Sequence, residues 1–429
     1  MNRANLFGYL ATHPRHNDVM TPHIALSPLR RALLTLGVTQ VINWGALYYT
    51  LAMIGPRISA ETGWSPTFVS SGFTVAMITM GLVSPFAGKT VDQHGGAWVM
   101  AIGSVIGALG LALLGLAHTP AVYLLAWAII GLAMGTCLYD SAFASLSQVA
   151  GNQTRKAISL LTLVGGFAST VFWPLTLFAL SYFDWRTVML AYAATILIVC
   201  APLHLVGLRK HRPLPEQSAA PETPPAEMPP HSRPAIPEKT ALILFALMLA
   251  GHGFVANAMS VHVITLFSGL GVSEHDAVLA GALIGPGQVG ARLVELLFGR
   301  RLNPLFLGLV AVILLPISFV IPLAFGASAG VAMTFGLVYG ASNGLMTIAR
   351  GIVPHALFGP VGYGRRLGLI SAPTMIVKAA SPAIFAWMMH VTGPNGAMIG
   401  AVILGIFASI AMIALALLAL RAARTPPAP

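Results

Sequence analysis

Two cationic side chains lie within stretches of sequence that are otherwise suited to lipid. Lys378 stands in the middle of APTMIVKAAS (372–381), eleven residues after Leu367, where an apolar run begins. On a helix this places the side chain about 16 Å into a membrane core that is about 30 Å thick. A charge at that depth costs about 2.5–3.5 kcal/mol on insertion scales and is usually functional. Lys378 therefore predicts either a structural ion pair with a carboxylate on a neighbouring helix or an ammonium that binds an anion in an aqueous cavity.

Arg292 is the second such cation. It lies in GPGQVGARLVE (285–295), seven residues before the inner end of its apolar run. A guanidinium can hold a carboxylate through two parallel hydrogen bonds, so Arg292 is a candidate substrate ligand. Glu295 is three residues further on and would share a helix face with it, which favours a local ion pair. The two interpretations are compatible, and Glu295 is also a candidate for proton coupling.

Asp140, in LYDSAF (138–143), is the acid that lies well inside the apolar runs of the first half of the chain. It lies toward the cytoplasmic end of its run. The position suits a proton carrier. It equally suits an ion pair with an inner-loop cation such as Lys89 or Arg155, and the sequence does not choose between these two roles.

Aromatic residues gather in the same runs. Trp44, Tyr48 and Tyr49 fall within INWGALYYT (42–50), and the four-residue spacing of Trp44 and Tyr48 places them on one helix face. Tyr139 adjoins Asp140, and Tyr339 lies in a later run. These side chains suit the wall of a substrate cavity, whereas packing between helices or an interfacial belt is the alternative for each of them.

Two other patterns are weaker indications of a function. FAGKT (86–90) has the end of a phosphate-binding loop, but the first glycine of that motif would be residue 83, which is Val83. Met248, His252 and Met259 share one apolar run, and thioether and imidazole groups can bind copper. Methionine is also a common apolar filler, so these three remain candidates for a metal path and no cofactor is predicted.

Composition decides the class of protein. Of 429 residues, 56% are hydrophobic and 8% are charged, against about 25% charged in a soluble domain. The mean hydropathy is +0.82. A membrane protein with many spans is expected. The net charge of +11 does not indicate nucleic acid, because the basic residues stand at the ends of apolar runs. Cys137 and Cys200 lie inside such runs, which leaves no disulfide framework.

The apolar runs number twelve, since a spanning helix needs about 20 mostly apolar residues. They cover approximately 33–55, 67–87, 97–117, 121–146, 157–180, 187–207, 241–267, 277–298, 304–325, 328–349, 367–389 and 396–420. A proline-rich segment divides them six and six. The predicted organisation is a tail (1–31), a six-helix half (32–207), a linker (208–239), a second half (240–420) and a short tail (421–429). Equal halves indicate a transporter built from repeats.

Lysine and arginine predict the orientation. With the N-terminus in the cytoplasm, 18 of the 23 basic residues lie in the tails and inner loops, and only Arg57 and Arg186 lie in outer loops. This bias is the one that cytoplasmic loops show. Both termini are therefore predicted to lie inside. The remaining three basic residues are Arg292, Arg350 and Lys378.

The loop GKTVDQHGG (88–96) resembles a signature of the major facilitator superfamily, GxxxD[RK]xG[RK]. Gly88, Asp92 and Gly95 match it, whereas Gln93 and Gly96 stand at its basic positions. The resemblance implies that Asp92 helps to hold one conformational state and does not bind substrate.

Within that superfamily, the chain resembles the oxalate–formate antiporter and monocarboxylate transporter branch. Such proteins have an arginine in span eight, and the oxalate–formate members have a lysine in span eleven; Arg292 and Lys378 stand at these places. The acid that monocarboxylate carriers have four residues before the arginine is Gln288 here, so that proton role does not carry over.

These observations predict an all-α protein of the major facilitator fold, monomeric, in a bacterial inner membrane. The predicted function is transport of a small mono- or dicarboxylate by alternating access, as an exchanger or a proton symporter. A drug exporter, an importer of copper or of a vitamin such as riboflavin, and a membrane sensor are the alternatives. An enzyme is not expected, because no nucleophile–base pair and no HExxH motif is present.

Overall fold

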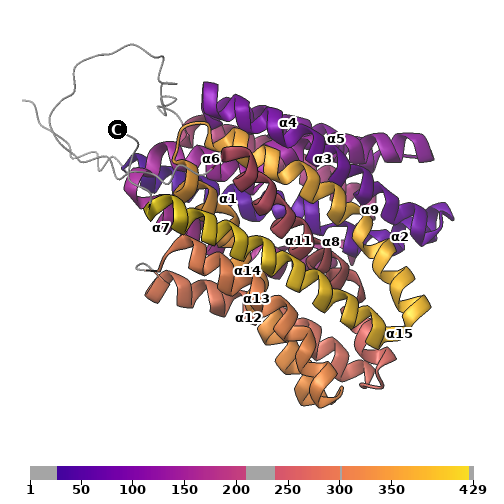
Figure 1. The fold of residues 1–429 in the computed structure, drawn as a ribbon. Coiled ribbons are helices and arrows are strands. Elements are labelled where there is room, and N and C mark those ends of the chain that lie inside the picture. Colours follow the sequence, from indigo (N-terminus) through magenta and orange to yellow (C-terminus); the bar gives the residue numbers. More distant parts are fainter. Residues whose placement is uncertain (1–26, 209–236, 300–301, 425–429) are drawn as a thin grey trace, which may run out of the picture.

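The computed structural model describes residues 27–208, 237–299 and 302–424. The regular structure of these ranges is entirely helical, as predicted (Figure 1). The elements are α1 (Pro28–Asn43), η1 (Trp44–Tyr49), α2 (Leu51–Thr62), α3 (Pro66–His94), α4 (Gly96–Gly115), α5 (Pro120–Cys137), α6 (Tyr139–Ala150), η2 (Gly151–Gln153), α7 (Thr154–Gly165), α8 (Ala168–Leu180), α9 (Trp185–Thr195), η3 (Ile196–Cys200), α10 (Ala201–Gly207), α11 (Glu238–Gly269), α12 (Glu274–Phe298), α13 (Pro304–Phe325), α14 (Ala329–Phe358) and α15 (Tyr363–Arg424).

Several helices begin at a capping side chain followed by proline. At the start of α3, Ser65 Oγ accepts a hydrogen bond from the Phe68 N–H at 3.2 Å, and Pro66 is the first helical residue. The same arrangement starts α1, α5 and α13. The side chain satisfies a free N–H group of the first turn, and proline has no N–H to satisfy. The starts of α1, α3 and α5 lie one to five residues before the corresponding apolar runs, whereas α13 and its run both begin at residue 304.

Within the described ranges, nine helical stretches are long and apolar enough to cross a membrane. Two of them, Pro120–Leu180 and Tyr363–Ala422, have about 60 residues and would extend about 90 Å if straight. The turn Gly151–Gln153 divides the first, and Gly393, at φ 70°, divides the second. With both divided, and with α1, η1 and α2 taken as one further rod, the stretches correspond to the twelve predicted segments.

The path of α15 shows that it folds back at its kink. Tyr363 and Ala419, near its two ends, pack in one hydrophobic cluster, whereas Phe385 and Ala397 pack in another. Both ends of the helix therefore lie at the same end of the molecule, and the kink lies at the opposite end.

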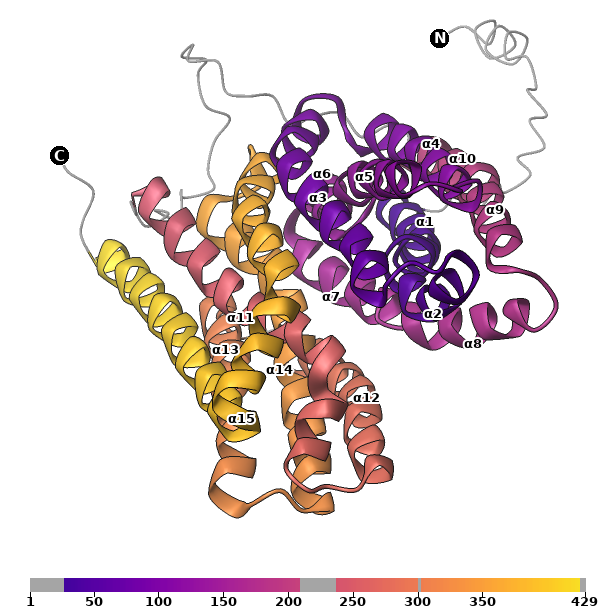
Figure 2. The same ribbon diagram turned by 90° about the vertical axis from the view of Figure 1, so that its right-hand side faces the viewer.

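The predicted linker falls mostly outside the described residues, which resume at Pro237. Since α11 begins at Glu238, the boundary predicted after residue 239 is slightly late. Figure 2 shows the helices on either side of this gap as two bundles. We refer to 27–208 as the N-terminal half and to 237–424 as the C-terminal half.

The two halves meet closely at one end of the molecule, where α3 lies along the first part of α15. A Cβ atom on Gly88 would overlap the carbonyl group of Gly364, and one on Gly368 would overlap that of Ser84. A hydrophobic cluster closes the same end and draws from both halves: it includes Val91, Phe143, Ile158, Ile352 and Leu367. We call this end of the molecule the inner end.

A side chain at Gly88 should separate the inner ends. In Gly88→Val, the added atoms meet the α15 backbone, which cannot rotate away as a flexible side chain can. We expect maleimide labelling of a cysteine at Ile158, which is fully buried at this interface, to rise at least several-fold. Gly330→Val is the matched control, because a Cβ there meets nothing within 4 Å. Unchanged labelling in Gly88→Val would contradict the described contact.

Candidate functional site

Arg292 lies on α12 and reaches across to the N-terminal half. Its side chain is 4% exposed. Nη1 donates to the Thr162 carbonyl oxygen at 3.2 Å, while Nε donates to the Gly344 carbonyl oxygen at 3.4 Å. Nη2 donates to Gln288 Oε1 at 3.2 Å and to Thr347 Oγ1 at 3.3 Å. These acceptors are all neutral, and no carboxylate contacts Arg292 among the residues that the structure describes.

Two features of the N-terminal half leave space for the Arg292 side chain. Helix α7 ends at Gly165 and α8 starts at Ala168, so the rod is interrupted opposite Arg292. A Cβ on Gly166 would overlap Arg292 Nη1. Glycine at this position therefore allows the guanidinium to approach the backbone of the interrupted helix.

The predicted pair between Arg292 and Glu295 is not formed. Instead, Glu295 Oε1 lies 3.0 Å from Arg155 Nη2, and Glu295 Oε2 accepts a hydrogen bond from Ser159 Oγ at 2.6 Å. Both partners lie on α7 of the other half, and they occupy both carboxylate oxygens. Spacing along one helix favoured a local pair, but contacts across the interface replace it.

Lys378 lies on α15 and is half-buried. Its stem passes over Gly253 of α11, where an added Cβ would lie 3.2 Å from Cγ and Cδ. The ammonium makes no hydrogen bond or ion pair with any residue in the described part of the chain. Arg350 and Asp140 lie close enough for their charges to act on it. Lys378 is thus a second cation inside the bundle without a bonded carboxylate.

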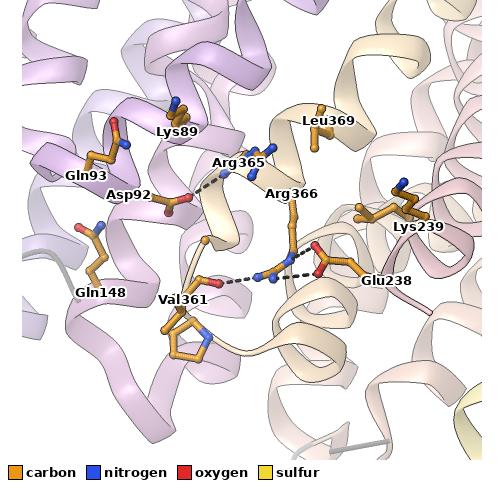
Figure 3. Close-up of a pocket in the computed structure, with 13 residues that line it drawn as sticks. Lys89, Asp92, Gln93, Gln148, Glu238, Lys239, Val361, Arg365, Arg366 and Leu369 are labelled. Carbon is orange, nitrogen blue, oxygen red and sulfur yellow. Dashed lines mark hydrogen bonds and ion pairs between the residues drawn. The ribbon is translucent and has the colours of Figure 1, made fainter. Parts of the chain in front are cut away.

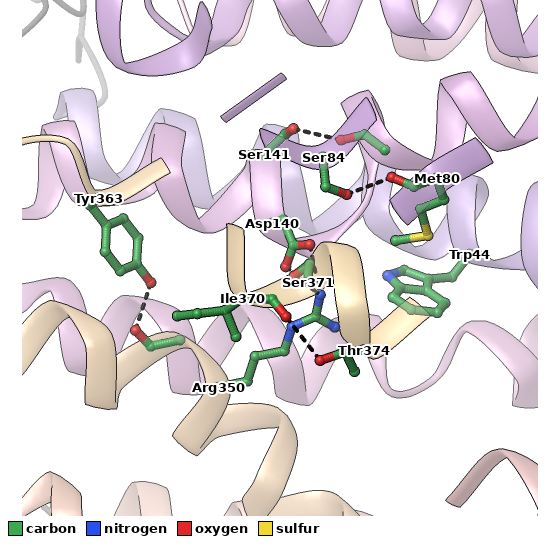
Figure 4. A network of polar contacts seen from close by, with 12 residues as sticks. Trp44, Met80, Ser84, Asp140, Ser141, Arg350, Tyr363, Ile370, Ser371 and Thr374 are labelled. Carbon is green, nitrogen blue, oxygen red and sulfur yellow. Dashed lines mark hydrogen bonds and ion pairs between the residues drawn. The ribbon is translucent and has the colours of Figure 1, made fainter. Parts of the chain in front are cut away.

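Asp140 forms an ion pair that joins the two halves. Its Oδ1 lies 2.5 Å from Arg350 Nη2, and the same nitrogen donates to Asp140 Oδ2 at 2.6 Å (Figure 4). Arg350 also donates to Ser371 Oγ at 2.8 Å. The expected pair with Lys89 or Arg155 is therefore wrong, because Arg155 is bound to Glu295 and a cation of the opposite half reaches Asp140 instead. Arg350 stands one residue beyond the predicted run 328–349, and its place in the sequence did not indicate this role.

The aromatic side chains of the N-terminal half form one cluster. Trp44, Tyr48 and Tyr49 stand on the π-helical turn η1, and their rings lie 4.9–6.1 Å apart by centroid. Tyr139 lies 5.0 Å from Trp44. Phe73, whose ring is 5.0 Å from that of Tyr48, extends the cluster and was not anticipated from the sequence. Trp44, Tyr48 and Tyr49 are only half-buried, so part of their surface is accessible.

Tyr48 connects this cluster to the helix that carries Lys378. Its hydroxyl lies 3.4 Å from Asn257 Oδ1 on α11. The Asn257 amide nitrogen donates to the Lys378 carbonyl oxygen at 2.8 Å and to Ser381 Oγ at 3.3 Å. The structure therefore brings the aromatic cluster and the Lys378 helix together. Asn257 is a polar residue in an apolar run, and this was the one signal that could have identified it.

Tyr339 lies elsewhere. Its ring stacks on Phe335 at 5.2 Å, and its hydroxyl donates to the Ala256 carbonyl oxygen at 3.2 Å. It is almost fully buried in the core cluster of the C-terminal half. Its contacts are those of helix packing.

Met248, His252 and Met259, the candidate metal ligands, do not lie together in one site. His252 Nε2 is hydrogen-bonded to Ser342 Oγ at 3.1 Å. Met248 and Met259 are fully buried and belong to different hydrophobic clusters. No group of three His, Cys, Asp or Glu side chains that could hold a metal occurs among the described residues.

The predicted conformational loop contacts the opposite half. Asp92 Oδ1 and Oδ2 accept hydrogen bonds from the backbone N–H groups of Gly364 and Arg365, at 2.9 and 2.8 Å. These N–H groups belong to the first turn of α15, where a helix attracts negative charge. Gly95, at φ 81°, ends α3 in a conformation that glycine adopts without strain. Asp92 thus fixes the inner end of α3 against α15.

The fold and this buried polar interface define a helical membrane transporter. The model of the Major Facilitator Superfamily matches residues 36–355, and the chain belongs to that superfamily. Its members are transporters, which is consistent with the expectation that the chain is not an enzyme.

Three known proteins illustrate the similarity. Multidrug resistance protein MdtL of Klebsiella pneumoniae subsp. pneumoniae is 29% identical over 170 residues, which are 39% of this chain and 43% of that protein. The crystal structure of the human organic anion transporter MFSD10 (TETRAN) gives a TM-score of 0.64 at 15% identity, over 90% of this chain and 100% of that chain. The proton:xylose symporter XylE, bound to 6-bromo-6-deoxy-D-glucose, gives 0.67 at 12% identity, over 90% and 95%. The two structural likenesses concern the fold alone.

Proposed function

We propose that this protein is a secondary transporter that moves a small organic anion, a mono- or dicarboxylate, by alternating access between its two halves. The observation that carries this proposal is that Arg292 and Lys378 have no paired carboxylate among the described residues. Both lie inside the bundle, and neither contacts a carboxylate of the described residues. Arg155 and Arg350, at the same interface, are each paired with a carboxylate. A carboxylate substrate would supply the missing partner.

The energetic argument follows from burial. A buried charge is costly unless it is paired, and a pair of charges in a medium of low effective dielectric attracts an anion more strongly than in water. Trp44, Tyr48 and Tyr49 would form the apolar wall opposite Lys378. An empty carrier holds these cations unpaired and resists the change of state. Bound substrate neutralises them, which favours exchange over free uniport.

The membrane orientation completes the proposal. We place the N-terminus, the linker and the C-terminus in the cytoplasm of a bacterial cell, with the chain a monomer in the inner membrane. The inner end then faces the cytoplasm, and the described conformation is closed on that side. Proton symport is the alternative to exchange, with Asp140 or Glu295 as the group that carries the proton. The position of Arg292 and Lys378 supports the oxalate–formate and monocarboxylate branch.

The direct test is ligand-dependent thermal stabilisation of the purified protein. A ligand at one hundred times its Kd adds about 2.7 kcal/mol to the apparent stability of the folded state. We expect at least one small carboxylate, in a panel that also holds aromatic acids, lipophilic cations, riboflavin and Cu(I), to raise the unfolding temperature. That effect should disappear in Arg292→Gln. A panel in which no carboxylate acts would oppose the proposal.

A drug exporter is the second candidate, and two observations favour it. One is the partial identity with the multidrug resistance protein. The other is the half-buried aromatic cluster around Trp44, since aromatic faces bind organic cations. This candidate predicts stabilisation by a lipophilic cation that persists in Arg292→Gln. Loss of that stabilisation in Trp44→Ala would place the cation at the aromatic cluster.

A further inference from the structure

A cavity of about 730 Å³ opens at the inner end of the interface, away from Arg292 and Lys378. It lies between α3 and α6 of the N-terminal half and α11 and α15 of the C-terminal half (Figure 3). Lys89, Lys239 and Arg365 line it, together with the acids Asp92 and Glu238. The charged residues that line the cavity therefore come from both halves.

The acids of this cavity are already engaged. Glu238 Oε1 accepts a hydrogen bond from Arg366 Nε at 2.8 Å. Both Asp92 oxygens accept from the first turn of α15, as described above. The side chains of Lys89, Lys239 and Arg365, in contrast, are exposed and make no hydrogen bond or ion pair with residues 27–208, 237–299 or 302–424. The cavity thus presents three unpaired cations and no free acid among its lining residues.

The surface beside the cavity is apolar. On α3, Leu82 and Phe86 precede Lys89 by seven and three residues, so the three share one helix face. Leu82 is 58% exposed and Phe86 is 73% exposed, as suits contact with acyl chains. Leu369 of α15, which lines the cavity, is also exposed. A ligand that combines a phosphate with hydrocarbon chains could occupy the cavity and this face at once.

We infer that this cavity binds a phosphate group, that of an acidic phospholipid of the inner leaflet, through Lys89 of one half and Lys239 and Arg365 of the other. Cations of a juxtamembrane segment attract anionic lipids, and these three converge from helices of both halves. A phosphate held by all three bridges the halves beside the Asp92 contact. Acidic lipid therefore stabilises the conformation that is closed at the inner end.

The test measures binding of a short-chain phosphatidylglycerol to the full-length protein in neutral detergent. We expect Lys89→Gln/Lys239→Gln to weaken this binding at least tenfold. The control is Arg30→Gln/Lys156→Gln, which removes two exposed inner cations outside the cavity and should leave the affinity unchanged. In nanodiscs of phosphatidylcholine, added phosphatidylglycerol should lower maleimide labelling of a cysteine at Ile158 in the control but not in the cavity variant.

Inorganic phosphate distinguishes the source of the ligand. Weak competition by phosphate in the millimolar range identifies a lipid headgroup, whereas competition as strong as that of unlabelled phosphatidylglycerol identifies a soluble phosphate at the same site. Equal binding by the cavity variant and the control would overturn the inference, as would the absence of any binding. The single variants Lys89→Gln and Lys239→Gln serve if the double variant does not fold.

Discussion

Lys378→Met should weaken carboxylate binding by about 10- to 150-fold while leaving the protein folded. The range follows from the net value of a hydrogen bond to a charged group, about 1.5–3 kcal/mol, at 1.36 kcal/mol for each factor of ten. Methionine keeps an unbranched stem over Gly253, so the substitution removes the charge with little change in packing. Lys156→Met is the matched control, because Lys156 is exposed at the inner end of α7.

The two variants separate the function of Lys378 from its structural role. If Lys378 only filled space or repelled Arg350, removal of its charge would leave affinity unchanged and would raise stability. The measurement is the carboxylate concentration at half-maximal thermal stabilisation, in both variants and in the unaltered protein. Equal values for all three would contradict the assignment of Lys378 to the site.

Asp140→Ala should destabilise the folded protein by about 3–5 kcal/mol, the usual cost of removing one partner from a buried pair. Arg350 is the reason: its side chain is 15% exposed and would keep its charge without a carboxylate. Ser371 Oγ, a neutral acceptor, would remain as its hydrogen-bond partner. The expected result is a lower unfolding temperature in the same detergent.

The double variant Asp140→Ala/Arg350→Met provides the comparison. Since it removes both members of the ion pair, it should recover most of the stability that Asp140→Ala loses. The two single substitutions should therefore be strongly non-additive, as expected for residues in contact. Additive losses would mean that the pair across α6 and α14 contributes nothing specific, and the interface would then be held by its apolar cluster alone.

Much of the fold could be predicted from the sequence, because long apolar runs need helices that satisfy their own backbone in a membrane. The breaks inside the runs could not. The chain leaves α-helical geometry at Leu138, and α7 ends at Gly165 before α8 begins at Ala168. Gly165 and Gly166 stand at the second break, but glycine also occurs within unbroken helices such as α4 and does not by itself locate a break. The break after Gly165 receives Arg292, which comes from a helix more than 100 residues away.

The residue types of the candidate site could be predicted from the sequence, but the interaction partners of those residues could not. Intramembrane charges are rare, so Arg292, Lys378 and Asp140 could be identified one at a time. Their pairing depends on which helices adjoin. Spacing favoured Glu295 for Arg292, yet α7 supplies Arg155 and Ser159 to Glu295 from the opposite half. Arg350 reaches Asp140 across 210 residues of sequence, a distance at which periodicity contains no information.

Carboxylate counterflow in proteoliposomes tests the central claim most directly. Vesicles loaded with an unlabelled small carboxylate that stabilises the protein would receive the same carboxylate, radiolabelled, outside. The account predicts rapid accumulation of label with the unaltered protein, loss of accumulation with Lys378→Met, and normal accumulation with Lys156→Met. Accumulation that is equally fast with Lys378→Met would contradict the claim that the Lys378 ammonium binds the transported anion.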